Sequence, residues 1–152
     1  MIEVTLAIGV AAFCLIAVMG LLPVAIKIQQ ASVQQTKANA IMSQIASDLL
    51  ADVQLPPGQA SKAQGNWSNL HGHWAQVATP DLLYFTNDAK QTGSVNQGSA
   101  PSDAVFRAII TYMLPPTTTT SLASIQVTWP ASVDPTIAAP AGSVQTLISV
   151  NR

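Results

Sequence analysis

The sequence predicts an α+β protein in which one long N-terminal α-helix packs on a small antiparallel β-sheet head. Three observations support this prediction. Residues 4–26 form an apolar run without a charged side chain, and a polar segment with a narrow apolar stripe follows it. Nine of the ten prolines lie beyond position 55, which marks a change in composition. Beyond position 80, apolar and polar residues alternate as they do in β-strands.

The apolar run from Val4 to Ile26 is long enough to cross a membrane. As an α-helix it would rise about 35 Å, against about 30 Å for the hydrocarbon core of a bilayer. A cleaved secretory signal needs a basic segment ahead of its apolar core, whereas the only charged side chain there is Glu3. The nearest positive side chain, Lys27, follows the run, and the positive-inside rule would place that side in the cytoplasm. We therefore expect a basic leader before Met1 that was removed or left out.

The helical pattern continues beyond the apolar run, so we expect a single helix over residues 1–53 with an apolar half and an amphipathic half. Apolar residues recur in the second half at spacings of three and four, which aligns them on one side of a helix. This stripe consists of Ala31, Ala38, Ile41, Met42, Ile45 and Leu49. Such a stripe needs an apolar surface to cover it, and the predicted sheet offers one.

Gly20 and Pro23 are poor helix formers inside the apolar run. A proline within a helix removes one backbone hydrogen bond and clashes with the preceding turn, at a cost of about 3 kcal/mol. One interpretation is a kink or a short melted stretch at these residues. The other is that membrane helices tolerate glycine and proline better than soluble helices do.

Residues 54–80 predict an irregular connection, because Pro56 and Pro57 must end the helix. His71 and His73 lie in this connection, but no third metal ligand is near them, and closed zinc sites need four. Ordinary polar contacts in a loop are the favoured interpretation. Thr117–Thr120, a possible glycosylation site, is likewise best interpreted as a solvated turn.

The head is expected to comprise residues 81–152. Its strand-like runs are Leu82–Thr86, Ala104–Leu114, Ser124–Trp129 and Val144–Val150. The last three should form an antiparallel meander with one apolar face, and residues 87–103 should form an exposed, mobile loop. The residues expected at the contact between helix and sheet are Ala38, Ile41, Ile45 and Leu49 on the helix and Ile125, Val127 and Trp129 on the sheet.

Composition argues against several classes of function. Charged residues make up 9% of the chain and the net charge is −1, so there is no electrostatic basis for binding nucleic acid. The single cysteine, Cys14, excludes an intrachain disulfide and a cysteine-based metal cluster. The carboxylates are scattered, and no phosphate-binding glycine loop, nucleophile elbow or histidine dyad is present. We therefore expect a structural protein without catalytic residues, metal or cofactor.

Glu3 precedes the apolar run directly. An unpaired carboxylate costs about 2.5–3.5 kcal/mol at the middle of a bilayer. Glu3 either lies near the membrane interface, where the positive end of the helix dipole favours it, or meets a positive partner. The simplest such partner is the N-terminal ammonium of another copy, at Met1. The chemistry of the residue leaves both interpretations open.

The N-terminal sequence Met-Ile-Glu-Val-Thr-Leu-Ala resembles the mature N-terminus of type IV pilins and type II secretion pseudopilins. Those proteins begin with a phenylalanine, followed by a few residues, a glutamate and a long apolar helix, and Glu3 takes the place of the glutamate. The stretch from Val4 to Pro23 is most similar to the Verru_Chthon cassette B proteins, a pilin-like family, and the motif Ile-Gln-Val-Thr-Trp-Pro at 125–130 supports this resemblance. The usual phenylalanine is missing here, and Met1 stands two residues before Glu3 instead of a longer lead-in.

The resemblance implies a structural subunit of a type IV pilus-like or pseudopilus filament, with a helix-on-sheet head. The subunit would wait in the bacterial inner membrane and then enter an extracellular or periplasmic filament. Its partners would be other copies of itself or related pilins, a prepilin peptidase and an assembly platform, and Glu3 and Met1 would act in assembly. The alternative is a single-span membrane-anchored binding or accessory protein that never polymerises. A membrane-tethered enzyme is a weaker alternative, for want of catalytic residues.

Overall fold

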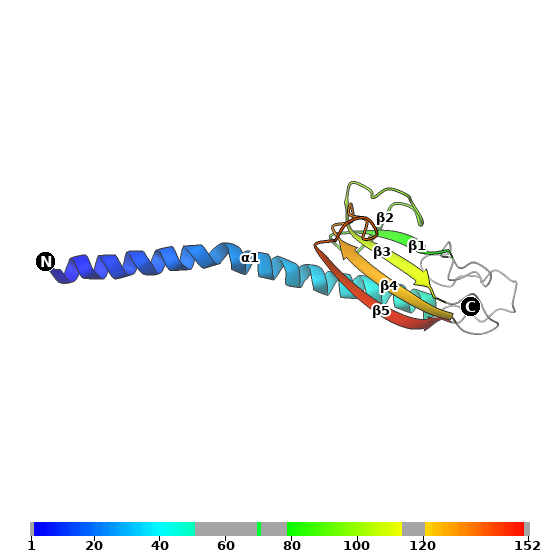
Figure 1. The fold of residues 1–152 in the computed structure, drawn as a ribbon, viewed down its shortest axis with the longest axis horizontal. Helices are drawn as coiled ribbons and strands as arrows, with labels where there is room; N and C mark the ends of the chain where they lie inside the picture. Colours follow the sequence, from blue (N-terminus) through cyan, green and yellow to red (C-terminus); the bar gives the residue numbers. More distant parts are fainter. Residues whose placement is uncertain (1, 51–69, 71–78, 114–120, 151–152) are drawn as a thin grey trace, which may run out of the picture. The chain divides into compact units, whose positions relative to one another are not determined.

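The fold is α+β, as predicted, with one long helix packed on a five-stranded antiparallel sheet (Figure 1). A computed structural model describes residues 2–50, 70, 79–113 and 121–150. Its elements are α1 (Ile2–Leu50), β1 (Asp81–Thr86), β2 (Gln91–Thr92), β3 (Ala104–Tyr112), β4 (Ser121–Trp129) and β5 (Gly142–Val150). The chain divides into two compact units, Met1–Gln34 and Gln35–Arg152, and the second contains the end of α1 together with the whole sheet.

The strands follow the order β2-β1-β3-β4-β5, and every neighbouring pair is antiparallel. Strands β3, β4 and β5 form the predicted meander, since each pairs with the next in the sequence. β4 and β5 pair without a shift from Ser121 opposite Val150 to Trp129 opposite Gly142. The β1–β3 pair is less regular, because its register shifts between Phe85 and Thr86. The short strand β2 was not predicted from the sequence.

The end of α1 and one face of the sheet share a single apolar core, which confirms the predicted contact. Its buried members include Ala38, Ile41, Ile45 and Leu49 from α1 and Ile125, Val127 and Trp129 from β4. Neighbouring strands extend the apolar face, because the register aligns Val127 with Ala108 of β3 and Val144 of β5. Met42 packs against this core while remaining partly exposed. Ala31, which the spacing places in the same stripe, is exposed and belongs to the first unit, which does not contain the sheet.

Trp129 and Gly142 are in close contact at the end of the β4–β5 pair. They lie opposite each other in the register, and a Cβ on Gly142 would overlap the indole of Trp129. The indole also meets Phe106 edge to face, with ring centroids 6.0 Å apart and planes inclined at 69°. Position 142 therefore requires glycine because an aromatic ring occupies the place of its side chain.

The predicted loop at 87–103 is largely exposed, as expected, but its hydrogen bonding does not support the predicted mobility. Asn96 lies against the outer edge of β1, where its backbone N–H donates to the carbonyl of Leu82 at 2.8 Å. The side-chain oxygen of Asn96 accepts a hydrogen bond from the backbone N–H of Leu82 at 2.7 Å. The φ of Asn96 is 61°, a left-handed conformation that asparagine tolerates better than most residues. Together with the pairing of β2 with Tyr84 and Phe85, these two bonds hold the loop against the edge of β1.

Several expectations concern residues outside those described. These residues are Met1, the helix end at 51–53, most of the connection at 54–80 including His71 and His73, Leu114, and Thr117–Thr120. Within the connection, Leu70 is described, and it is fully buried in the core of the head.

Ile45→Asp should unfold the head, because Ile45 is fully buried and an unpaired buried charge costs several kcal/mol. That cost is a large part of the roughly 5–15 kcal/mol by which a domain is stable. We expect a fragment beginning at Lys27 to be soluble and to unfold cooperatively on heating, whereas its Ile45→Asp variant should show no transition. Gln44→Asp is the control, because Gln44 is the exposed neighbour on the same helix. Equal melting temperatures for the two variants would show that this face of α1 does not cover the sheet.

Candidate functional site

The first part of α1 is an apolar surface exposed to solvent. Every residue from Ile2 to Val33 is exposed, including Phe13 at 74% and Met19 at 71%. The most apolar 18-residue window has a mean hydropathy of 2.5, and none of it is buried. By length and composition this helix can cross a membrane, although a signal sequence near an N-terminus shares those properties. Its complete exposure distinguishes it from the core helix of a soluble protein.

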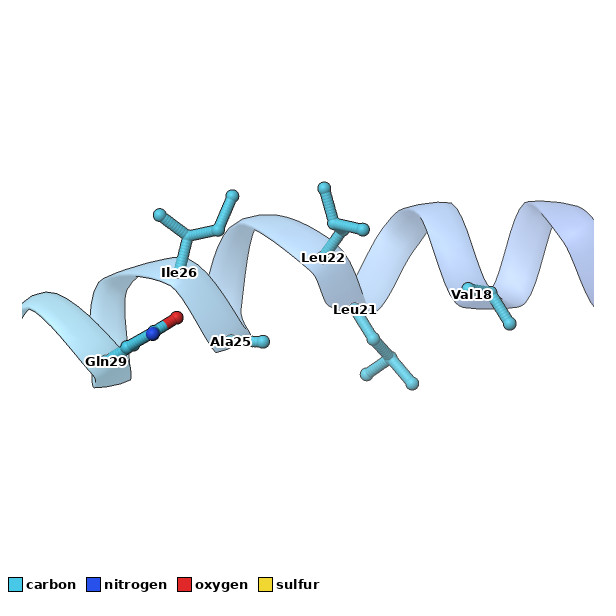
Figure 2. Close-up of a pocket in the computed structure, with 6 residues that line it drawn as sticks. All are labelled: Val18, Leu21, Leu22, Ala25, Ile26 and Gln29. Atoms are coloured by element: carbon cyan, nitrogen blue, oxygen red, sulfur yellow. The ribbon is translucent and has the colours of Figure 1, made fainter.

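The helix remains continuous through Gly20 and Pro23, so the structure does not contain the melted stretch that was one interpretation of the sequence. Pro23 has no N–H to donate to the carbonyl of Met19, but a single missing bond does not interrupt the helix. An open depression lies on the surface of this part of α1 (Figure 2). Its lining residues are Val18, Leu21, Leu22, Ala25, Ile26 and Gln29. A Cβ on Gly20 would meet no atom within 4 Å, so contacts inside the chain do not require this glycine.

Glu3 lies in the first turn of α1. The partial positive charge of the helix N-terminus stabilises a carboxylate there. In the same turn, the hydroxyl of Thr5 donates to the carbonyl of Ile2 at 2.8 Å. The predicted ion pair between Glu3 and the N-terminal ammonium of another copy involves a second chain and remains a prediction.

A carboxylate at the start of β1, Asp81, is completely buried in the head. It accepts a hydrogen bond from the hydroxyl of Tyr112 at 2.7 Å and another from the side-chain amide of Asn96 at 3.0 Å. These bonds connect β1, β3 and the 87–103 loop, and they supply the polar partners that a buried carboxylate needs. Sequence reasoning counted Asp81 among the scattered acids. Only the strand register, which sets Asp81 opposite Ile110, brings it to the same face as Tyr112.

A second polar group lies on the other face of the sheet. The guanidinium of Arg107 forms an ion pair with Asp134 at 2.8 Å and lies 6.0 Å from the ring centre of Tyr84. Asp134 also accepts hydrogen bonds from the hydroxyl and the backbone N–H of Thr136, at 2.6 Å and 2.9 Å. These contacts hold the pKa of Asp134 below 3.8. The hydrogen bond from the Thr136 hydroxyl lowers this pKa most, the bond from the Thr136 N–H comes next, and the positive charge of Arg107 lowers it further. The ion pair between Arg107 and Asp134 connects the loop after β4 to strand β3.

These polar groups join segments of the head that are distant in the sequence. Among the residues that the structure describes, no three histidine, cysteine, aspartate or glutamate side chains could hold a metal ion together. No protein-family model matches the chain, and neither a curated protein nor a solved structure was found to be similar to it. Functional inference therefore rests on the chemistry of the chain itself, and the apolar surface of α1 is its most distinctive feature.

Tyr112→Phe should destabilise the head by about 1–3 kcal/mol, because a buried carboxylate would lose one of its hydrogen-bond donors. The melting temperature of the variant measures this effect. Tyr84→Phe is a matched control on the opposite face, since the hydroxyl of Tyr84 makes no hydrogen bond to the described residues. Equal destabilisation by the two variants would mean that loss of a tyrosine hydroxyl, and not of the bond to Asp81, is responsible.

Asp134 should make stability depend on pH in acid. Its folded-state pKa lies below the ordinary 3.8, so its ionised form stabilises the folded head above that pH. This contribution should disappear as the pH falls from 3.8 through the folded-state pKa. Melting temperatures should therefore be higher for wild type than for Asp134→Asn at neutral pH and should converge in acid. Thr136→Ala should reduce the difference, and a difference that does not change with pH would contradict the assignment.

Proposed function

We propose that this chain is a structural subunit of a type IV pilus-like or pseudopilus filament. The observation that carries the proposal is an apolar helix that is exposed from Ile2 to Val33 and is joined to a head with a core of its own. The subunit is held in the bacterial inner membrane by this helix before assembly. It then enters a filament at the cell surface or in the periplasm, with its apolar helix in the filament core.

The division of α1 into an exposed and a buried part supports this function. Among the described residues of α1, burial begins only at Ala38. Keeping the preceding apolar side chains in water is unfavourable, at a cost of about 25 cal/mol for each Å² of apolar surface that stays exposed. They require an apolar environment from outside the chain, which a lipid bilayer or the helices of other subunits would provide.

Transfer from lipid to a filament core is physically simple for such a helix. Lipid tails and leucine side chains are similarly apolar, so the exchange has little hydrophobic cost and close packing decides which state is preferred. Small residues let helix backbones approach, and this helix carries Ala7, Gly9, Ala11, Ala12 and Ala17. A Cβ on Gly9 would meet no atom within 4 Å, so that position is open for a neighbouring helix.

The N-terminal motif supports a filament over a simple anchor. Glu3 stands where pilin-like proteins carry their glutamate, and in a filament core it would pair with the N-terminal ammonium of a neighbouring subunit. Two charges 4 Å apart attract by about 4 kcal/mol at an effective dielectric near 20, before desolvation is counted. Leaving one of them buried alone is the more costly state. By the same resemblance, a prepilin peptidase and an assembly platform would be its partners, and the role is structural and not enzymatic.

The second candidate is a single-span membrane protein whose head binds or supports another component without polymerising. The specific observation in its favour is that the chain separates into two compact units, with the whole sheet in the second. An anchored head needs only this arrangement. The two candidates differ in whether Glu3 has a partner in another copy.

Glu3→Ala should separate these candidates. The variant should insert into the membrane at wild-type levels or slightly above, because the substitution removes a charge from an apolar helix. Filament yield should fall at least tenfold, because the terminal ammonium of the neighbouring subunit would be left buried without its partner. Immunoblots of membranes and electron microscopy of sheared surface material measure the two quantities.

Glu3→Asp is the control, because it keeps a carboxylate at the same position and should retain more filaments than Glu3→Ala. Wild-type filament yield from Glu3→Ala would refute the proposed ion pair. Absence of this chain from any sheared filament, with the protein retained in membranes, would favour the non-polymerising anchor.

A further inference from the structure

The two edges of the sheet differ in how accessible they are to another strand. At the β1 edge, β2 pairs with Tyr84 and Phe85, and Asn96 occupies both the N–H and the carbonyl of Leu82. The 87–103 loop therefore occupies the backbone groups that an incoming strand would need. At the opposite edge, β5 pairs with β4 alone among the described residues.

Strand β5 lacks the features that usually protect a sheet edge. Natural edges are blocked by charged side chains, prolines, bulges or very short strands. The nine residues of β5, Gly142–Val150, contain no charged residue and no proline, and they pair with β4 without a shift. β4, the adjacent strand, also has no charged residue. An edge of this kind readily accepts a further antiparallel strand.

The side chains of β5 are suited to such an addition. Val144, Thr146 and Ile148 are half-buried on the face that meets the core, so a further strand would cover the part that is still exposed. On the other face, Leu147 is 58% exposed between polar neighbours. Covering both rows would remove apolar surface from water without burying a charge.

We propose that β5 pairs antiparallel with β5 of a second copy of this chain and joins two heads into one continuous sheet. Because the β1 edge is closed, β5 is the edge strand among the described elements that is open for pairing, and a second copy presents the same open strand. A twofold axis at Thr146 gives a self-complementary register. It sets Val144 opposite Ile148 of the second copy on the core face, and Ser143 opposite Ser149 of the second copy on the exposed face. No like charges meet.

The geometry of this pair predicts where it acts. A twofold axis perpendicular to the sheet reverses the direction of every element in the second head, including the part of α1 that follows Gln35. The contact therefore links heads whose helices run in opposite directions, and it differs from the contacts between successive subunits of one filament. It would join neighbouring filaments or heads on facing surfaces, and it does not depend on whether the chain polymerises.

Disulfide trapping in the full chain tests the pairing. In a detergent-solubilised Cys14→Ser background, Thr146→Cys would place its thiol opposite its own counterpart, with the two Cα atoms about 4.5–5.5 Å apart. A disulfide spans about 4.4–6.8 Å between Cα atoms, so mild oxidation should give a covalent dimer. Ser143→Cys is the control on the same strand, because the twofold axis would separate its two copies by about 20 Å. We expect at least fivefold more dimer from Thr146→Cys.

Charge substitutions at the exposed pair 143 and 149 test the register. In the Thr146→Cys chain, Ser143→Lys with Ser149→Lys would set like charges opposite each other and should reduce the dimer at least fivefold. Ser143→Lys with Ser149→Glu would set opposite charges together and should keep the dimer within twofold of the parent. Both serine side chains are exposed, so circular dichroism should show folded protein in each case.

Three outcomes would overturn the proposal: no dimer from Thr146→Cys in folded protein, equal dimer from Ser143→Cys, or equal effects of the two charge pairs. Trapping of a species other than the dimer would assign the edge to a different occupant and would also overturn it. If Thr146→Cys does not fold, Ser143→Cys with Ser149→Cys replaces it, with each single variant as its control. Filament yield is a separate measurement, so failure of the filament proposal would not be confused with failure of this one.

Discussion

The burial of the α1 stripe against the sheet is the contact on which the rest of the structure depends. It joins the two layers of the head, because Ala38, Ile41, Ile45 and Leu49 occupy the same core as the apolar faces of the strands. It also determines where α1 changes from an exposed helix to a partly buried one, since no described part of the head covers the residues before this stripe. One continuous helix thus has a first part that is apolar and exposed and a last part that is buried on one side in the core of the head.

The sequence predicted this architecture well where periodicity carries the information. Spacings of three and four identified the buried face of α1 from Ala38 to Leu49, and strict alternation identified the buried face of β4. Ala31 continues the same spacing but is exposed, because periodicity states which side of a helix a residue occupies and not how far the partner surface extends.

The polar contacts of the head could not be predicted in this way, because they depend on pairing between distant segments. Asp81 and Tyr112 are 31 positions apart, and only the β1–β3 register brings them to one face. Asn96 belongs to a stretch whose composition is typical of a solvated loop, yet its hydrogen bonds to Leu82 close one edge of the sheet. Composition indicates the average exposure of this loop, whereas the hydrogen bonds of Asn96 and the pairing of β2 with β1 depend on its particular backbone path.

The contact between Trp129 and Gly142 has a consequence for how this sequence can vary. Because the indole occupies the space of a side chain at position 142, any larger residue there must displace the ring or the strand. A smaller residue at position 129 would remove that restriction and leave a gap beside Phe106. Selection on either position is therefore conditional on the other, and across homologous heads tryptophan and glycine should be inherited as a pair.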